Sequence, residues 1–102
     1  MIGPIPQWPN NDERCLAAHI AEVQACSIAT ADLDLPRYEA PQAAAATAAG
    51  VVFVSPTPWV CGDRCEPVIA DIRVYSGLYH FSLTYSTYLT GALREALQAA
   101  MA

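Results

Sequence analysis

An alanine-rich helix that leads directly into a short apolar strand is the feature that most constrains the fold of this chain. Pro41 suits a first helical turn, and residues 43–49 have the highest helix propensity in the sequence. Gly50 follows where a left-handed helix cap is expected, and residues 51–54 then form a β-branched and aromatic run that ends before Pro56. Such a run is typical of a strand buried on both faces of a parallel sheet. Helix, tight turn and buried strand make half of a β-α-β unit, so we expect an α/β fold with a parallel sheet.

The rest of the chain offers weaker signals of secondary structure. Residues 2–5 resemble the end of a strand, which suggests that upstream partners are missing, and the apolar spacing of Leu16, Ile20 and Val23 predicts a helix over 12–24. We expect loops at 27–39 and 76–81, and a small hairpin of 68–69 with 72–75 around Ala70 and Asp71. Ser82 is placed to cap a last helix, with one apolar face formed by Tyr85, Leu89, Leu93, Leu97 and Ala100.

The composition excludes several classes of partner. The 102 residues carry a net charge of −5 with only five Lys and Arg, and these are scattered. Because the sequence has no cationic cluster, we expect it to bind neither nucleic acid nor anionic lipid. No apolar run is long enough to span a bilayer, and the N-terminus lacks the features of a signal peptide. Hydrophobic residues make up 54% and charged residues 15%, which favours a fragment whose partner covers part of the apolar surface.

Four cysteines in a short chain point to disulfides and an oxidising compartment. Zinc is the main alternative, but ten residues lie between Cys15 and Cys26 and three between Cys61 and Cys65, unlike the usual paired knuckles. A turn-like stretch lies between Cys61 and Cys65, so this pair can come close enough for a disulfide. A bridge from Cys15 to Cys26 requires a helix that starts after Cys15 and ends well before Cys26, because one continuous helix would hold them about 16 Å apart.

The candidates for chemistry are few. His80 lies in an expected loop before the last helix, near the end of an expected strand where open α/β sheets place ligands. Trp59 could line a pocket, although a buried core tryptophan is an equally good interpretation. The sequence has no nucleophile elbow, phosphate-binding glycine loop or metal-binding helix motif, so we expect no metal and no cofactor.

The motif P-T-P-W-V-C at 56–61, then C-E-P-V-I at 65–69 and His80, resembles the C-terminal part of SGNH domains. These domains are fused to multi-pass membrane acyltransferases that modify cell-surface glycans. The resemblance covers nearly all of this chain but only about the last half of the family domain. It implies that residues 1–102 are a C-terminal SGNH segment with a partial three-layer, flavodoxin-like fold whose N-terminal half is missing.

The resemblance also assigns roles. In the family, a Gly-Asp-Ser block supplies the nucleophile, a glycine and an asparagine help form the oxyanion hole, and a D-x-x-H pair supplies the base and its orienting acid. His80 matches the histidine, whereas Gly77 stands where the aspartate should be. Trp59 and Tyr79 are the candidate substrate-binding residues. The implied location is the extracytoplasmic face of the cell envelope, although this chain shows no export signal.

Three functional hypotheses follow. The first is a truncated or degenerate SGNH segment, related to O-acylation of surface polysaccharide and inactive alone. The second is one half of an O-acyltransferase or esterase, completed by an upstream SGNH half or by a membrane acyltransferase domain. The third is a module that binds glycan or another partner near Trp59 and Tyr79.

Overall fold

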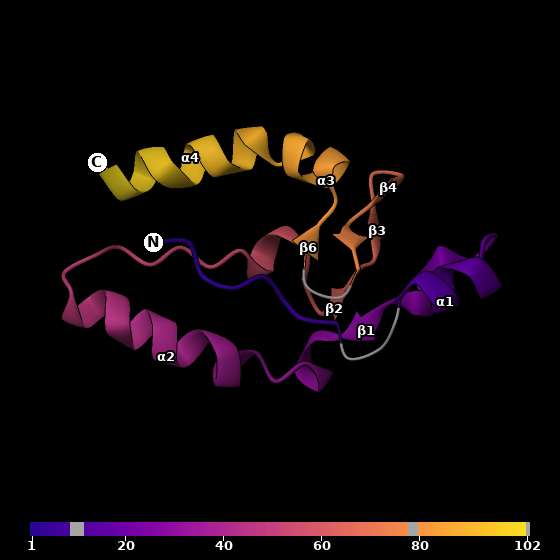
Figure 1. The fold of residues 1–102 in the computed structure, drawn as a ribbon, viewed down its shortest axis with the longest axis horizontal. Coiled ribbons are helices and arrows are strands. Elements are labelled where there is room, and N and C mark those ends of the chain that lie inside the picture. The colour runs from indigo at the N-terminus through magenta and orange to yellow at the C-terminus, as the bar shows by residue number, and fades with distance from the viewer. Residues whose placement is uncertain (9–11, 78–79, 102) are drawn as a thin grey trace.

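The computed structural model describes residues 1–8, 12–77 and 80–101, which form an elongated molecule of 45 × 27 × 21 Å (Figure 1). Its α-helices are α1 (Asp12–Ala18), α2 (Leu35–Ala48), α3 (Leu83–Tyr88) and α4 (Thr90–Met101). Three short 3-10 helices are η1 (Val23–Cys26), η2 (Thr30–Asp32) and η3 (Thr57–Trp59). The strands are β1 (Ile28–Ala29), β2 (Arg64–Cys65), β3 (Val68–Ile69), β4 (Ile72–Arg73), β5 (Tyr75–Ser76) and β6 (His80–Phe81).

The strands contradict the expected parallel sheet. They form three separate two-stranded antiparallel sheets, β1 with β2, β3 with β4 and β5 with β6. The one parallel pairing in the described part of the chain is an isolated bridge between Ile2 and Val54. Val51 and Val52 are 47% and 53% exposed, so the run 51–54 is not buried on both faces. A partial flavodoxin-like fold is therefore wrong for this chain as it stands.

The Ile2–Val54 bridge is nevertheless well defined. Gly3 donates its backbone N–H to the carbonyl of Val54 at 2.8 Å, and Val54 donates to the carbonyl of Met1 at 2.8 Å. The N-terminal segment therefore lies beside residues 52–54, and in Figure 1 helices α2 and α4 are seen on opposite sides of this pair. One bridge is too short to make a sheet.

Helix α2 confirms its predicted end but not its predicted start. It begins at Leu35 with Pro36 in its first turn, so Pro41 lies inside the helix. Pro suits the first turn because its missing N–H has no partner there anyway. The C-terminal end matches the prediction, since the helix stops at Ala48 and Gly50 adopts a left-handed φ of 70°.

Two further local predictions are confirmed. Strands β3 and β4 form the expected hairpin, and its turn residues Ala70 and Asp71 both have positive φ, as a tight two-residue hairpin turn requires. Ser82 caps α3 by accepting a hydrogen bond from the backbone N–H of Tyr85 at 3.1 Å. The predicted helix 12–24 is shorter, because α1 ends at Ala18, and the predicted loop at 76–81 includes paired strand residues.

The core is built around aromatic rings from distant parts of the sequence. Trp8 contacts Tyr75, Tyr75 contacts Phe81, and Phe81 contacts Tyr85, with ring centroids 5.4–5.9 Å apart. The hydroxyl of Tyr75 donates to the carbonyl of Pro6 at 2.7 Å, which joins the N-terminal segment to the β5–β6 hairpin. The other buried members of this cluster are Leu33, Val60, Cys61, Cys65, Val74 and Leu89.

Candidate functional site

His80 lies on the exposed side of the β5–β6 hairpin. In this hairpin Ser76 pairs with His80 and Tyr75 pairs with Phe81. Because neighbouring strand residues point to opposite faces, Tyr75 and Phe81 face the core whereas Ser76 and His80 face solvent. His80 is thus set on an open surface rather than in a cleft.

Among the residues that the structure describes, no carboxylate contacts the imidazole of His80. No hydrogen bond or ion pair joins its side chain to another residue in the described ranges, Ser76 included. Gly77, where the family resemblance predicts the orienting acid, has a left-handed φ of 77° in the turn of the hairpin. An L-amino acid with a side chain would be strained at such a φ, so the turn itself favours glycine.

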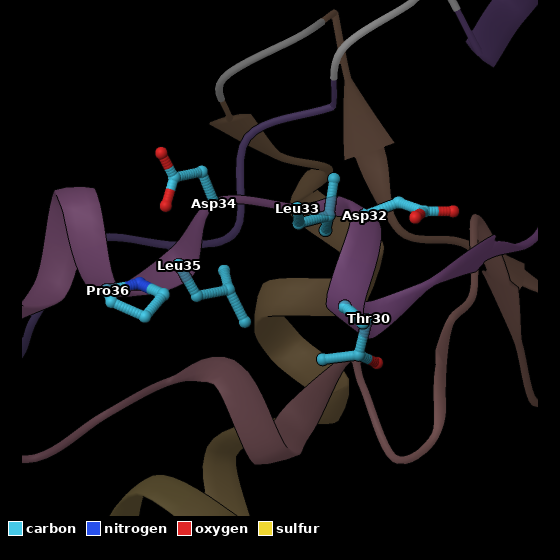
Figure 2. Close-up of a pocket in the computed structure, with 7 residues that line it drawn as sticks. Thr30, Asp32, Leu33, Asp34, Leu35 and Pro36 are labelled. Atoms are coloured by element: carbon cyan, nitrogen blue, oxygen red, sulfur yellow. The ribbon is translucent and has the colours of Figure 1, made fainter.

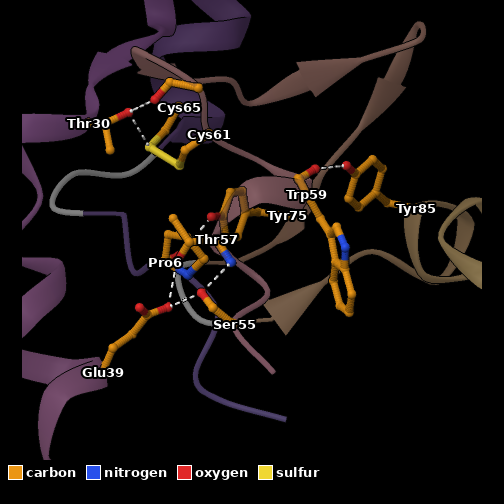
Figure 3. The surroundings of a disulfide bond; sticks show 11 residues. Pro6, Thr30, Glu39, Ser55, Thr57, Trp59, Cys61, Cys65, Tyr75 and Tyr85 are labelled. Carbon is orange, nitrogen blue, oxygen red and sulfur yellow. Dashed lines mark hydrogen bonds between the residues drawn. A yellow bond between two sulfur atoms is a disulfide. The ribbon is translucent and has the colours of Figure 1, made fainter. Parts of the chain in front are cut away.

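Trp59 lies at the end of η3 and is half-buried. Its backbone carbonyl accepts a hydrogen bond from the hydroxyl of Tyr85, which ties the loop to α3 (Figure 3). Its ring lines a pocket together with Phe81, on the face of the β5–β6 hairpin opposite to His80. The structure therefore does not bring Trp59 and His80 into one site, and Tyr79 lies outside the described residues.

A cluster that the sequence did not indicate joins α2 to the loop before Trp59. The hydroxyls of Ser55 and Thr57 both donate to Oε1 of Glu39, at 2.5 and 2.6 Å (Figure 3). The backbone N–H of Thr57 also donates to Oγ of Ser55 at 3.2 Å. Glu39 was expected in a loop, and no local pattern connects it to residues 16 and 18 positions away. The cluster fixes the loop that carries Trp59.

The cysteines form two disulfides. One joins Cys15 to Cys26 with Cα atoms 5.8 Å apart, and the other joins Cys61 to Cys65 with Cα atoms 4.0 Å apart. Cys15 lies within α1 rather than before it, but the helix ends three residues later and the chain folds back into η1 as the bridge requires.

Residues 27–30 hold the short loop between Cys61 and Cys65. The hydroxyl of Thr30 donates to the carbonyl of Gly62 at 2.6 Å, and its backbone N–H donates to the carbonyl of Asp63 at 3.0 Å. Nε of Arg64 donates to Oγ of Ser27 at 2.7 Å. Since Ser27 follows Cys26 directly, the two disulfides are linked through strand pair β1–β2.

A surface pocket next to the second disulfide has neither His80 nor Trp59 in its lining. It has a volume of about 590 Å³ and is lined by one continuous segment, Thr30 to Pro36. Figure 2 shows the carboxylates of Asp32 and Asp34 pointing away from one another, so they do not converge on a cation. Over the described ranges, no three His, Cys, Asp or Glu side chains are placed to hold a metal ion. None of the described helices is long and apolar enough to cross a bilayer.

Comparison with known proteins agrees with the motifs around the second disulfide and His80. The model of the SGNH domain, described as fused to AT3 domains, matches residues 1–95. No curated protein and no solved structure matches the chain. With nearly the whole of its length matched by that one model, this chain belongs to the SGNH domain family whose members are fused to AT3 domains.

Proposed function

We propose that this chain is a degenerate SGNH segment, related to O-acylation of cell-surface polysaccharide, that does not transfer or hydrolyse acyl esters by itself. The observation that supports this most strongly is the setting of His80 on an exposed hairpin face, where none of the described carboxylates is its partner. In this proposal His80 is the remnant of a general base. The two disulfides are compatible with an extracytoplasmic location.

The missing acid is a chemical defect and not a detail of sequence. In a serine hydrolase the acid holds the imidazole in the reactive tautomer and stabilises the imidazolium that forms. Replacing that acid with an amide lowers turnover about 10⁴-fold in one serine protease. Gly77 offers no polar side chain at all.

The nucleophile is the second missing part. The 102-residue sequence contains no Gly-Asp-Ser block, and Gly62-Asp63 is followed by Arg64. Ser76 lies opposite His80, but no hydrogen bond connects their side chains and both are exposed to solvent. Water around an exposed pair removes the low-dielectric, preorganised setting on which acyl transfer depends. We therefore expect His80 to react no faster than an ordinary surface histidine.

Hydrolysis of p-nitrophenyl acetate tests the proposal. The chain should show only the slow rate of exposed imidazoles, and His80→Ala should lower this rate no more than His19→Ala, since both histidines are exposed. A rate well above that of free imidazole that is kept in His19→Ala and lost in His80→Ala would overturn the proposal.

A second candidate is one half of an O-acyltransferase that a membrane acyltransferase domain or an upstream SGNH half completes. Its support is the exposure of apolar side chains around the N-terminal bridge, where Ile2, Val51 and Val52 are 46–53% exposed. Fluorophosphonate labelling of the co-expressed pair tests it, with His80→Ala as the control. Labelling that requires both partners and His80 supports this candidate, and labelling of neither partner excludes it.

A further inference from the structure

A pocket on the core side of the β5–β6 hairpin is lined by residues that have no role in the proposed function. Its volume is about 220 Å³. It lies between the N-terminal segment, the loop around η3 and helices α3 and α4. The residues that line it are Ile2, Ile5, Pro56, Trp59, Phe81, Ser86, Leu89 and Leu93.

The lining restricts the chemistry of a ligand. It contains no charged side chain, and its polar side-chain groups are the hydroxyl of Ser86 and the indole N–H of Trp59. A charged ligand would lose its hydration without gaining a counter-charge, and a sugar ring would leave most of its hydroxyls unpaired. The pocket therefore fits a neutral, mainly hydrocarbon ligand, and not the polysaccharide that was expected beside Trp59.

The walls are held in place before any ligand arrives. The loop carrying Trp59 is fixed at one end by the Glu39–Ser55–Thr57 hydrogen bonds and at the other by the Tyr85 hydroxyl on the Trp59 carbonyl. Phe81 packs edge-on against Tyr85 with ring centroids 5.4 Å apart. Ordered walls lower the entropic penalty of binding, which is what a preformed site requires.

The volume of the pocket and the aromatic rings in its lining restrict the class of ligand further. An apolar cavity of about 150 Å³ in another protein binds benzene, so a pocket of about 220 Å³ has room for one substituted ring. Trp59 and Phe81 can each meet such a ring in an offset or edge-on contact. We infer that this pocket binds a neutral single-ring aromatic compound. Because Phe81 and His80 face opposite sides of β6, the binding site is separate from His80.

Toluene and the full chain provide the test. At about five times its dissociation constant, toluene should raise Tm by about 4–8 °C, whereas glucose at the same concentration should leave Tm unchanged. In carbon-resolved NMR spectra toluene should shift the methyl signals of Leu89, which lines the pocket, and leave those of Leu16 on α1 unmoved.

Two matched variants show whether toluene binds in this pocket or on other apolar surface. Leu93→Phe fills the pocket and should abolish the toluene response, while Leu97→Phe, one helical turn further along α4 and outside the lining, should keep it. If Leu93→Phe does not fold, Ser86→Phe blocks the same pocket from α3. Equal responses of the filled variant and the parent chain, a response to glucose but not to toluene, or a chain without cooperative melting would each overturn the inference.

Discussion

At the scale of single residues, Gly3 is the glycine where an added methyl group has least room. A Cβ built on Gly3 would lie 2.4 Å from Cζ and 2.8 Å from Cε2 of Phe53. Gly3→Ala should therefore displace the Phe53 ring or break the Ile2–Val54 bridge. We expect it to lower the free energy of unfolding by about 1–3 kcal/mol. Urea unfolding measures the loss. Gly62→Ala is the control, since nothing lies within 4 Å of its Cβ; an equal loss in both variants would contradict the prediction.

Tyr85 makes the stability of the chain sensitive to alkaline pH. Burial raises the pKa of Tyr85, and neighbouring Tyr88 raises it further. A folded-state pKa above the unfolded value means that the stabilisation is complete below about pH 10 and is lost as the pH rises through the folded pKa. Unfolding free energies between pH 8 and 11 should therefore decrease at the alkaline end.

Removing the hydroxyl of Tyr85 separates its two contributions. Tyr85→Phe leaves the Trp59 carbonyl without this donor and should lower stability at pH 7 by about 1–3 kcal/mol. It should also flatten the alkaline decrease, while the exposed Tyr38→Phe should change neither quantity. A Tyr85→Phe variant with the parent chain's full alkaline decrease would show that another group is responsible.

At the scale of elements, what the sequence could predict depends on how local the cause is. The left-handed Gly50, the Ser82 cap and the β3–β4 hairpin each arise within at most six consecutive residues, and each was predicted correctly. The run 51–54 was predicted as a doubly buried strand, and that prediction is wrong because burial depends on neighbours that no local pattern specifies. The Glu39 cluster escaped prediction for the same reason, since its partners lie 16 and 18 positions away.

The hydrogen bonds of Glu39 fasten helix α2 to the loop of η3. Glu39→Leu would leave the hydroxyls of Ser55 and Thr57 without their acceptor, and we expect a loss of about 1–3 kcal/mol in unfolding free energy. Glu39→Gln keeps an acceptor oxygen and should lose less. Denaturant unfolding gives both values, with the exposed Glu95→Gln on α4 as a surface control. Equal losses for Leu and Gln would mean that the carboxylate charge matters and the acceptor does not.

At the scale of the whole molecule, the family was recognisable from the sequence although the sheet was not. The motif around Cys61, Cys65 and His80 identifies the SGNH domain, and the family model confirms it over residues 1–95. A parallel sheet needs several strands paired over long separations, and the described residues supply one bridge, Ile2 with Val54. A sequence motif shows that a chain is related to a family, whereas a sheet forms only where its strands are present and paired.

The Cys15–Cys26 disulfide joins helix α1 to η1, and an ion pair at 3.0 Å joins Glu13 of the same helix to Arg73. Both partners of that ion pair are partly exposed, so it adds little. Replacing Cys15 and Cys26 with Ser should release α1 and lower stability by up to about 3 kcal/mol, the closure entropy of a loop of this length. Figure 1 shows α1 at one end of the molecule, so its release should leave the aromatic core intact.

Limited trypsin digestion measures this release directly. Arg14 lies on α1 and is exposed, whereas Arg64 lies between the cysteines of the second disulfide and is held by Ser27. In the Cys15→Ser, Cys26→Ser variant, cleavage after Arg14 should become at least about tenfold faster, because local opening then costs less free energy than in the parent chain. Cleavage after Arg64 should change much less. Equal acceleration at both sites would mean that the first disulfide supports the whole molecule, and no acceleration at Arg14 would mean that contacts other than the disulfide hold α1.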